Sequence, residues 1–207
     1  MSNLSELMPY RGAVTERLLL REFSHRVKDE LASAIGLVAA AASRCDSSEA
    51  RASLAAALDM LQDHAHIQHS LQAPEYDTTI DLAAYLHPLC RAISRTRLAA
   101  DGTELLLSVY PLRMSSESCW LLGMIVFELI ADAAGHTFQN GSGSVRLEIS
   151  PAGGAIECRI TDNGRQVGDP SQVREIIEAL AGRLRGTVRS QSGPNGTSTT
   201  VSFPYGR

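Results

Sequence analysis

The chain has 207 residues, of which 44% are hydrophobic and 20% charged, so it is long and apolar enough for one ordinary domain or two small ones and does not have the composition of a disordered protein. Its net charge of −4 argues against a nucleic-acid partner. The four cysteines are widely spaced without a CxxC pair, and the longest nearly apolar run, 120–130, is far short of the roughly 20 residues of a membrane span. We expect a cytoplasmic protein with no membrane partner, no metal site and no disulfide framework.

The first part of the chain is predicted to be a helical hairpin. Residues 10–43 and 49–71 are rich in Ala, Leu, Glu and Arg, and the segment CDSSEA at 45–50 offers N-cap residues for the second helix. Two amphipathic helices cannot enclose a core alone, so a two-fold homodimer forming a four-helix bundle is the simplest arrangement. A short linker with a proline follows at 72–77.

The second part alternates helix and strand signals, which predicts an α+β sandwich of one sheet and one helical layer. The expected strands are mostly joined as hairpins. Helices are expected at 81–97, 116–138 and 170–184, and strands at 104–111, 144–150, 155–161, 186–192 and 197–204, with a turn at 193–196.

His25 is predicted to face solvent. At about 100° per residue, Leu20, Val27, Leu31, Ala34 and Val38 fall within about 80° of Phe23, whereas His25 falls near 200°, with Asp29 one turn further on. This placement disfavours a core histidine but leaves an ordinary surface histidine open.

Several segments in order resemble histidine kinases. The box LLLREFSHRVKDELAS resembles the phosphoacceptor segment of bacterial kinases with an HRxKN (HWE-like) signature, with Asp29 in place of its final Asn. The run LLGMIVFELIADAAGHTF resembles the N-box of that family, ITDNG at 160–164 its first glycine box, and GTSTTVSFP its closing strand. The resemblance extends over nearly the whole chain from about residue 14.

The resemblance implies a dimerisation and histidine-phosphotransfer hairpin at 10–72 and an ATPase-like α/β sandwich of the Bergerat type at 77–207. It implies phosphorylation of His25, whose neutral imidazole is a competent nucleophile near pH 7. Arg21, Arg26, Lys28 and Asp29 surround this residue and are expected to support the phosphoryl group or to contact a receiver domain of a response regulator.

The implied nucleotide site departs from the family pattern, so the ATPase-like domain is expected to be degenerate. Asp132 stands in place of the metal-binding Asn and Gly135 in place of a Lys, although His136 is kept, and Glu128 lies on the same helix face as these residues. Asp162, Gly164 and Thr197 resemble residues of the nucleotide pocket. However, Gln166 replaces a glycine, and only RQVGD separates Gly164 from the next helix, where the family has a long glycine-rich lid. We expect no cofactor, and Mg-ATP only if this domain is active.

Three hypotheses remain open. A degraded lid beside an intact phosphoacceptor helix favours a dimeric histidine phosphotransferase of a two-component phosphorelay, acting between receiver aspartates. The alternatives are an ATP-dependent histidine kinase core with an unusual lid and a non-catalytic dimeric adaptor for a response regulator. His64, His66 and His69 form a further cluster, but they do not share one helix face and are interpreted as surface residues.

Overall fold

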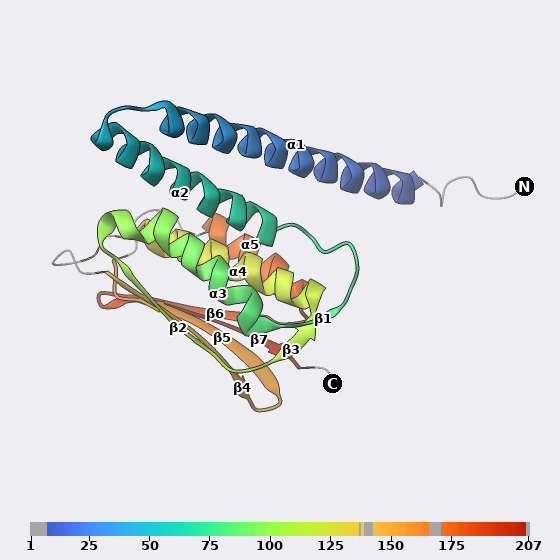
Figure 1. Ribbon diagram of the computed structural model, residues 1–207. Coiled ribbons are helices and arrows are strands. Elements are labelled where there is room, and N and C mark those ends of the chain that lie inside the picture. Colours follow the sequence, from blue (N-terminus) through green and yellow to red (C-terminus); the bar gives the residue numbers. More distant parts are fainter. Residues whose placement is uncertain (1–7, 137, 139–142, 166–170, 206–207) are drawn as a thin grey trace, which may run out of the picture. The chain divides into compact units, whose positions relative to one another are not determined.

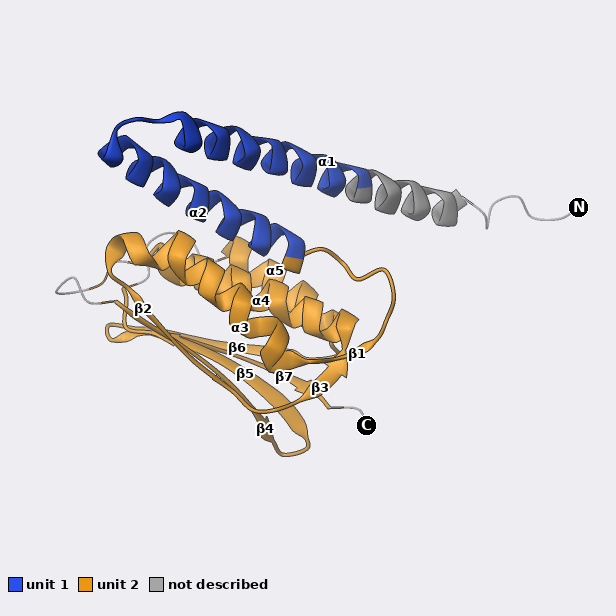
Figure 2. Ribbon diagram, in the orientation of Figure 1, with its two compact units in different colours: residues 1–69 blue, residues 70–207 orange. Residues whose placement is uncertain are grey.

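The computed structural model describes residues 8–136, 138, 143–165 and 171–205, with the backbone alone for residues 8–21. The chain divides into two compact units, residues 1–69 and residues 70–207 (Figure 2). Each unit is described below by itself.

The first unit is an antiparallel pair of helices, α1 (Met8–Arg44) and α2 (Ser48–Ser70) (Figure 1). Ser47 provides the N-cap predicted at this break, because its Oγ accepts the amide of Ala50 at 3.3 Å. Val27, Leu31, Ala34 and Val38 are half-buried and mark the stripe of α1 that faces inward. Phe23, taken as the zero of the predicted stripe, is instead 67% exposed and does not belong to the half-buried stripe of the single hairpin.

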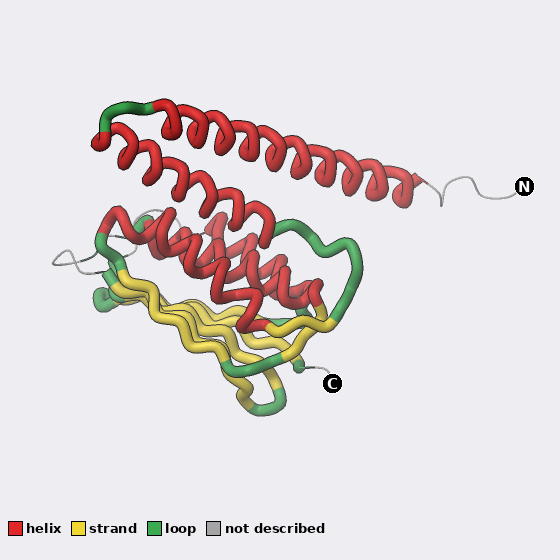
Figure 3. Tube along the Cα trace, viewed as in Figure 1, coloured by secondary structure: helices red, strands yellow, loops and turns green. Residues whose placement is uncertain are grey.

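The second unit has two layers, in which three helices cover one face of a five-stranded sheet (Figures 1 and 3). The strand order is β2-β4-β5-β7-β6. All neighbours are antiparallel except β2 and β4, which are parallel. The strands are β2 (Glu104–Val109), β4 (Ser144–Ala152), β5 (Ala155–Asp162), β6 (Thr187–Gly193) and β7 (Gly196–Pro204), and the helices are α3 (Leu82–Ile93), α4 (Ser116–Ala134) and α5 (Ser171–Arg183).

The core lies between the sheet and the helices. Alternate residues of β4, β5 and β7 are buried, as the two-residue period of a strand requires when one face is covered. They meet the apolar faces of α3 and α4. The buried residues are Val145, Leu147, Ile149, Ile156, Cys158, Ile160, Val201 and Phe203 of the sheet, and Leu86, Leu89, Ile93, Leu122, Ile125 and Val126 of the helices.

Most predicted elements are present, and four features differ from the prediction. The helix expected at 116–138 ends at Ala134, where Gly135 follows. The helix expected at 81–97 changes into a π-helical turn at Ser94–Leu98. A two-stranded sheet of β1 (Thr79–Asp81) and β3 (Arg113–Ser115) was not expected. Nor was the parallel pairing of β2 with β4, which makes the sheet mixed.

Two aromatic side chains bind the backbone where α2 ends and the linker begins. The hydroxyl of Tyr85 donates to the carbonyl of Ser70, and Nε1 of Trp120 donates to that of Leu71, both at 2.8 Å. Gly123 provides the space for the Tyr85 ring, since a Cβ at this glycine would lie only 2.8 Å from Cε1 of the tyrosine. Arg183 stacks over Trp120 at 5.2 Å from the ring centroid.

Tyr85→Phe tests the first of these hydrogen bonds. It removes only a hydroxyl whose bond to Ser70 is partly buried, so the free energy of unfolding is expected to fall by about 1 kcal/mol. Urea unfolding followed by circular dichroism gives the value. Tyr76→Phe, at a tyrosine that is 79% exposed, is the matched control and should leave the midpoint unchanged. Equal unfolding curves for Tyr85→Phe and the unmodified protein would contradict the prediction.

Candidate functional site

His25 is exposed on α1, as predicted from the helical period. It lies on the side of the helix opposite to the half-buried stripe through Val27, Leu31 and Val38. No apolar packing covers the ring in the described single chain, so the imidazole is accessible to a partner protein. An exposed imidazole on a regular helix is well placed to receive and release a group that a second protein carries.

The charged neighbours of His25 are also exposed. Arg26 pairs with Glu22 at 3.7 Å in an i,i+4 ion pair, and both side chains are more than two-thirds exposed. Lys28 and Asp29 are exposed on the same segment, whereas the side chain of Arg21 lies outside the described residues. Because surface ion pairs contribute little to stability, these charged side chains are held only weakly in place.

The second group of predicted site residues meets where α4 and β5 end. His136 is buried with its side chain 2% exposed, and its Nδ1 lies 3.0 Å from Oδ1 of Asp162. Its Nε2 lies 3.5 Å from Oδ2 of Asp132. This distance is too long for a good hydrogen bond, so the two groups interact as an ion pair. The carboxylates of Asp132 and Asp162 raise the pKa of His136 to about 9, against the opposing effect of burial. The histidine is therefore an imidazolium near neutral pH, held between two carboxylates.

Glycines allow the chain to close around this group. A Cβ on Gly164 would lie 2.7 Å from Cβ of His136 and 2.8 Å from the ring of Phe138. Its amide donates to Oδ1 of Asp162 at 2.9 Å, which forms an Asx turn at the end of β5. Gly196 has φ +128°, and its backbone approaches the carbonyl of Asp162 so closely that no Cβ fits. The sequence motif ITDNG thus holds Asp162 against His136.

The other predicted residues of this region lie in two different places. Thr197 and Asp132 line the same cavity between the helices and the sheet, whereas Glu128 does not line it. Glu128 lies near Arg97 instead, and burial raises the pKa of its carboxyl while the arginine opposes the shift. Gln166, predicted to replace a family glycine, lies outside the described residues.

Among the described residues, which leave out 137, 139–142 and 166–170, two features bear on whether a nucleoside triphosphate fits this site. The resemblance implies that the Asp162 carboxylate binds the adenine amino group, but its side chain is 4% exposed and its Oδ1 already accepts from His136 and Gly164. The neighbouring cavity measures about 130 Å³, and ordinary ligand pockets occupy about 300 Å³ or more. No group of three or more metal-ligating side chains is found among the described residues, and His64, His66 and His69 are all exposed.

Comparison with known proteins places the chain near histidine kinases. A family model described as histidine kinase matches residues 22–97, the segment that contains His25. No curated protein matches the chain. No helix within the described part of the chain has both the length and the apolar character needed to cross a membrane.

Solved structures with the same fold include both kinases and a phosphotransferase. The histidine kinase domain of the Erythrobacter litoralis EL346 blue-light activated histidine kinase has a TM-score of 0.56 and 24% identity, over 89% of this chain and 92% of that one. A bacterial phosphotransferase has a TM-score of 0.59 and 11% identity, over 91% and 96%. Acinetobacter baumannii histidine kinase AdeS has a TM-score of 0.51 and 14% identity, over 88% and 97%. The resemblance to HRxKN-type histidine kinases is confirmed, and these structures show the shared fold.

Proposed function

We propose that this chain, which has the core fold of a histidine kinase, is a histidine phosphotransfer protein of a two-component phosphorelay. His25 is its phosphorylated residue. The observation that supports the proposal most directly is the exposure of this imidazole within the one segment that matches the histidine kinase family model. The covered carboxylate of Asp162 and the small volume of the neighbouring cavity support a receiver aspartyl phosphate rather than ATP as the phosphoryl donor.

The transfer is a displacement at phosphorus. A lone pair on an imidazole nitrogen of His25 forms the N–P bond as the bond from phosphorus to the aspartyl oxygen of the receiver breaks, and the receiver regains a free carboxylate. The ring then releases the proton on its other nitrogen to solvent, or keeps it as a phosphoimidazolium. The reverse step passes the group to a second receiver. Arg26 and Lys28 lie on the same exposed segment and reduce the charge repulsion between the phosphoryl group and an acidic receiver pocket.

Dimerisation through the hairpin is part of the proposal. None of the described residues of α1 is buried, so the apolar stripe remains only half-covered in a single chain. Phe23, Leu37 and Met60 are exposed by 67%, 71% and 52%, which is unfavourable for large apolar side chains in water. A second hairpin packed against the first would cover them in a four-helix bundle with two-fold symmetry.

The identity of the phosphoryl donor tests the proposed function. The purified protein is incubated with labelled Mg-ATP, and in parallel with a receiver domain labelled on its aspartate and freed of excess reagent. We expect acid-labile, alkali-stable label only from the receiver. Label of this kind from Mg-ATP alone would show an ATP-dependent kinase and overturn the proposal. Retention of the receiver on the protein without transfer of label would indicate an adaptor instead.

A further inference from the structure

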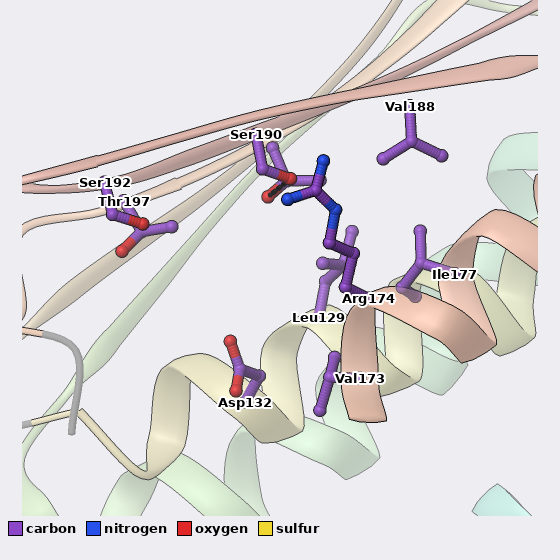
Figure 4. Close-up of a pocket in the computed structure, with 10 residues that line it drawn as sticks. Leu129, Asp132, Val173, Arg174, Ile177, Val188, Ser190, Ser192 and Thr197 are labelled. Carbon is purple, nitrogen blue, oxygen red and sulfur yellow. Dashed lines mark hydrogen bonds between the residues drawn. The ribbon is translucent and has the colours of Figure 1, made fainter. Parts of the chain in front are cut away.

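A small cavity lies between the helices and the sheet of the second unit (Figure 4). It measures about 130 Å³. Its walls come from α4, α5, β6 and β7, and Figure 4 shows Asp132 on α4 and the guanidinium of Arg174 extending from α5 towards Ser190. Its apolar surface is supplied by Leu129, Val173, Ile177 and Val188. The cavity is therefore an apolar space with a few polar groups, a composition that it shares with ligand sites although most of those are larger.

Two polar groups of the cavity wall can still form hydrogen bonds to a ligand. The carboxylate of Asp132 has only its 3.5 Å contact with His136 among the described side chains. The Oγ1 of Thr197 is buried and has no hydrogen-bond partner in the described part of the chain, which is costly unless a ligand or water supplies one. In contrast, Thr199 and Ser190 bond to each other at 3.0 Å.

The electrostatics favour a cationic group at Asp132. One imidazolium, that of His136, lies between two carboxylates, which leaves a net charge of about −1 on the group. Asp162 has the shorter contact with the ring and also accepts an amide from Gly164, whereas Asp132 is the more exposed of the two carboxylates and lines the cavity. The positive charge of Arg174, across the cavity, is compensated by Glu178 at 3.0 Å.

The volume sets the size of the ligand. An engineered apolar cavity of about 150 Å³ in another protein binds benzene, so a space of 130 Å³ accommodates about one six-membered ring. We propose that this cavity binds a compact ligand with a single apolar ring and a cationic N–H donor group, which binds Asp132 and Thr197. Its ring packs against Leu129, Ile177 and Val188. This binding is independent of phosphotransfer at His25 and makes the ATPase-like unit a sensor of a small molecule.

Benzamidine is the probe for this site, because it joins one ring to a cationic amidine. We expect its titration into the full-length protein, followed by ¹H–¹⁵N correlation spectra, to shift the amides around Asp132, Ile177 and Thr197 in a saturable way. Asp132→Asn should weaken binding at least tenfold, and Thr197→Val, which keeps the side-chain volume, about threefold. Asp101→Asn, at an exposed carboxylate of the short helical turn Ala99–Asp101, is the matched control and should bind as the unmodified protein does.

Ligand variants test the two parts of the proposal separately. Benzyl alcohol keeps the ring without the charge and benzoate reverses the charge, so both should bind at least tenfold more weakly than benzamidine. Equal binding of benzoate, or unchanged affinity in a folded Asp132→Asn protein, would overturn the proposed head-group site. Tighter binding of Mg-ADP than of benzamidine at the same amides would show instead that the cavity opens to nucleotides and would also overturn it.

Discussion

His25→Ala is expected to abolish transfer of label from a phosphorylated receiver, with a loss of at least about a thousandfold, because α1 contains no second imidazole to supply the attacking nitrogen. The side chain lies on the exposed face of α1, so its removal creates no cavity. The circular dichroism spectrum and the elution volume in size-exclusion chromatography should therefore be unchanged. The label is quantified as the acid-labile, alkali-stable fraction after a fixed time with excess receiver.

Two matched variants make this result specific. His64→Ala removes another exposed histidine of the hairpin, on α2, and should keep full labelling. Lys28→Ala leaves the nucleophile in place but removes a nearby cation, and should slow transfer several-fold without abolishing it. Normal labelling of a folded His25→Ala protein would move the phosphorylated residue elsewhere. Loss of dimerisation in His25→Ala would instead contradict the placement of this side chain on the exposed face.

The features that the sequence predicts well are those set by local periodicity. The exposed position of His25 follows from a 3.6-residue period over several turns, and the β4–β5 hairpin follows from two alternating segments around the turn at Gly153 and Gly154. Ser47 at the N-cap of α2 follows from residue type and position. Each of these signals lies within about twenty residues of chain, where the geometry of one element decides the outcome.

The features that were not predicted depend on contacts between distant segments. The parallel pairing of β2 with β4 requires a connection through α4, and nothing in the local sequence of either strand distinguishes it from an antiparallel pair. The π-helical turn at Ser94–Leu98 likewise has no local signature. The contact between His136 and Asp162 spans 26 positions. Motif resemblance identified both residues, but only the meeting of the ends of α4 and β5 shows that they bind each other.

The contacts of His136 with the two carboxylates are expected to stabilise the fold, by an amount that depends on pH. The pKa of His136 is raised from about 6.5 in the unfolded chain to about 9 in the fold, mainly by Asp132 and Asp162. A raised pKa stabilises the fold most at pH values below the unfolded pKa, and this contribution is lost as the pH rises through the folded pKa. A difference of this size corresponds to at most about 3 kcal/mol, and the 26% exposure of the Asp132 side chain allows solvent screening to reduce it.

We therefore expect His136→Gln to lower the free energy of unfolding by about 2–3 kcal/mol at pH 6.5, because two buried or partly buried carboxylates lose their shared cation. The difference between the two proteins should narrow as the pH rises from about 7 to 10, since the unmodified protein loses the same charge by deprotonation.

Urea unfolding at several pH values, followed by the fluorescence of Trp120, gives this difference. Comparing the two proteins cancels the contribution of the groups that they share. His87→Gln, at an exposed histidine of α3, is the control, and its difference in free energy of unfolding from the unmodified protein should not change with pH in this way. A constant difference across this pH range would mean that the charge of His136 does not hold Asp132 and Asp162 together. Packing around Gly164 and Phe138 would then hold this group together without the charge.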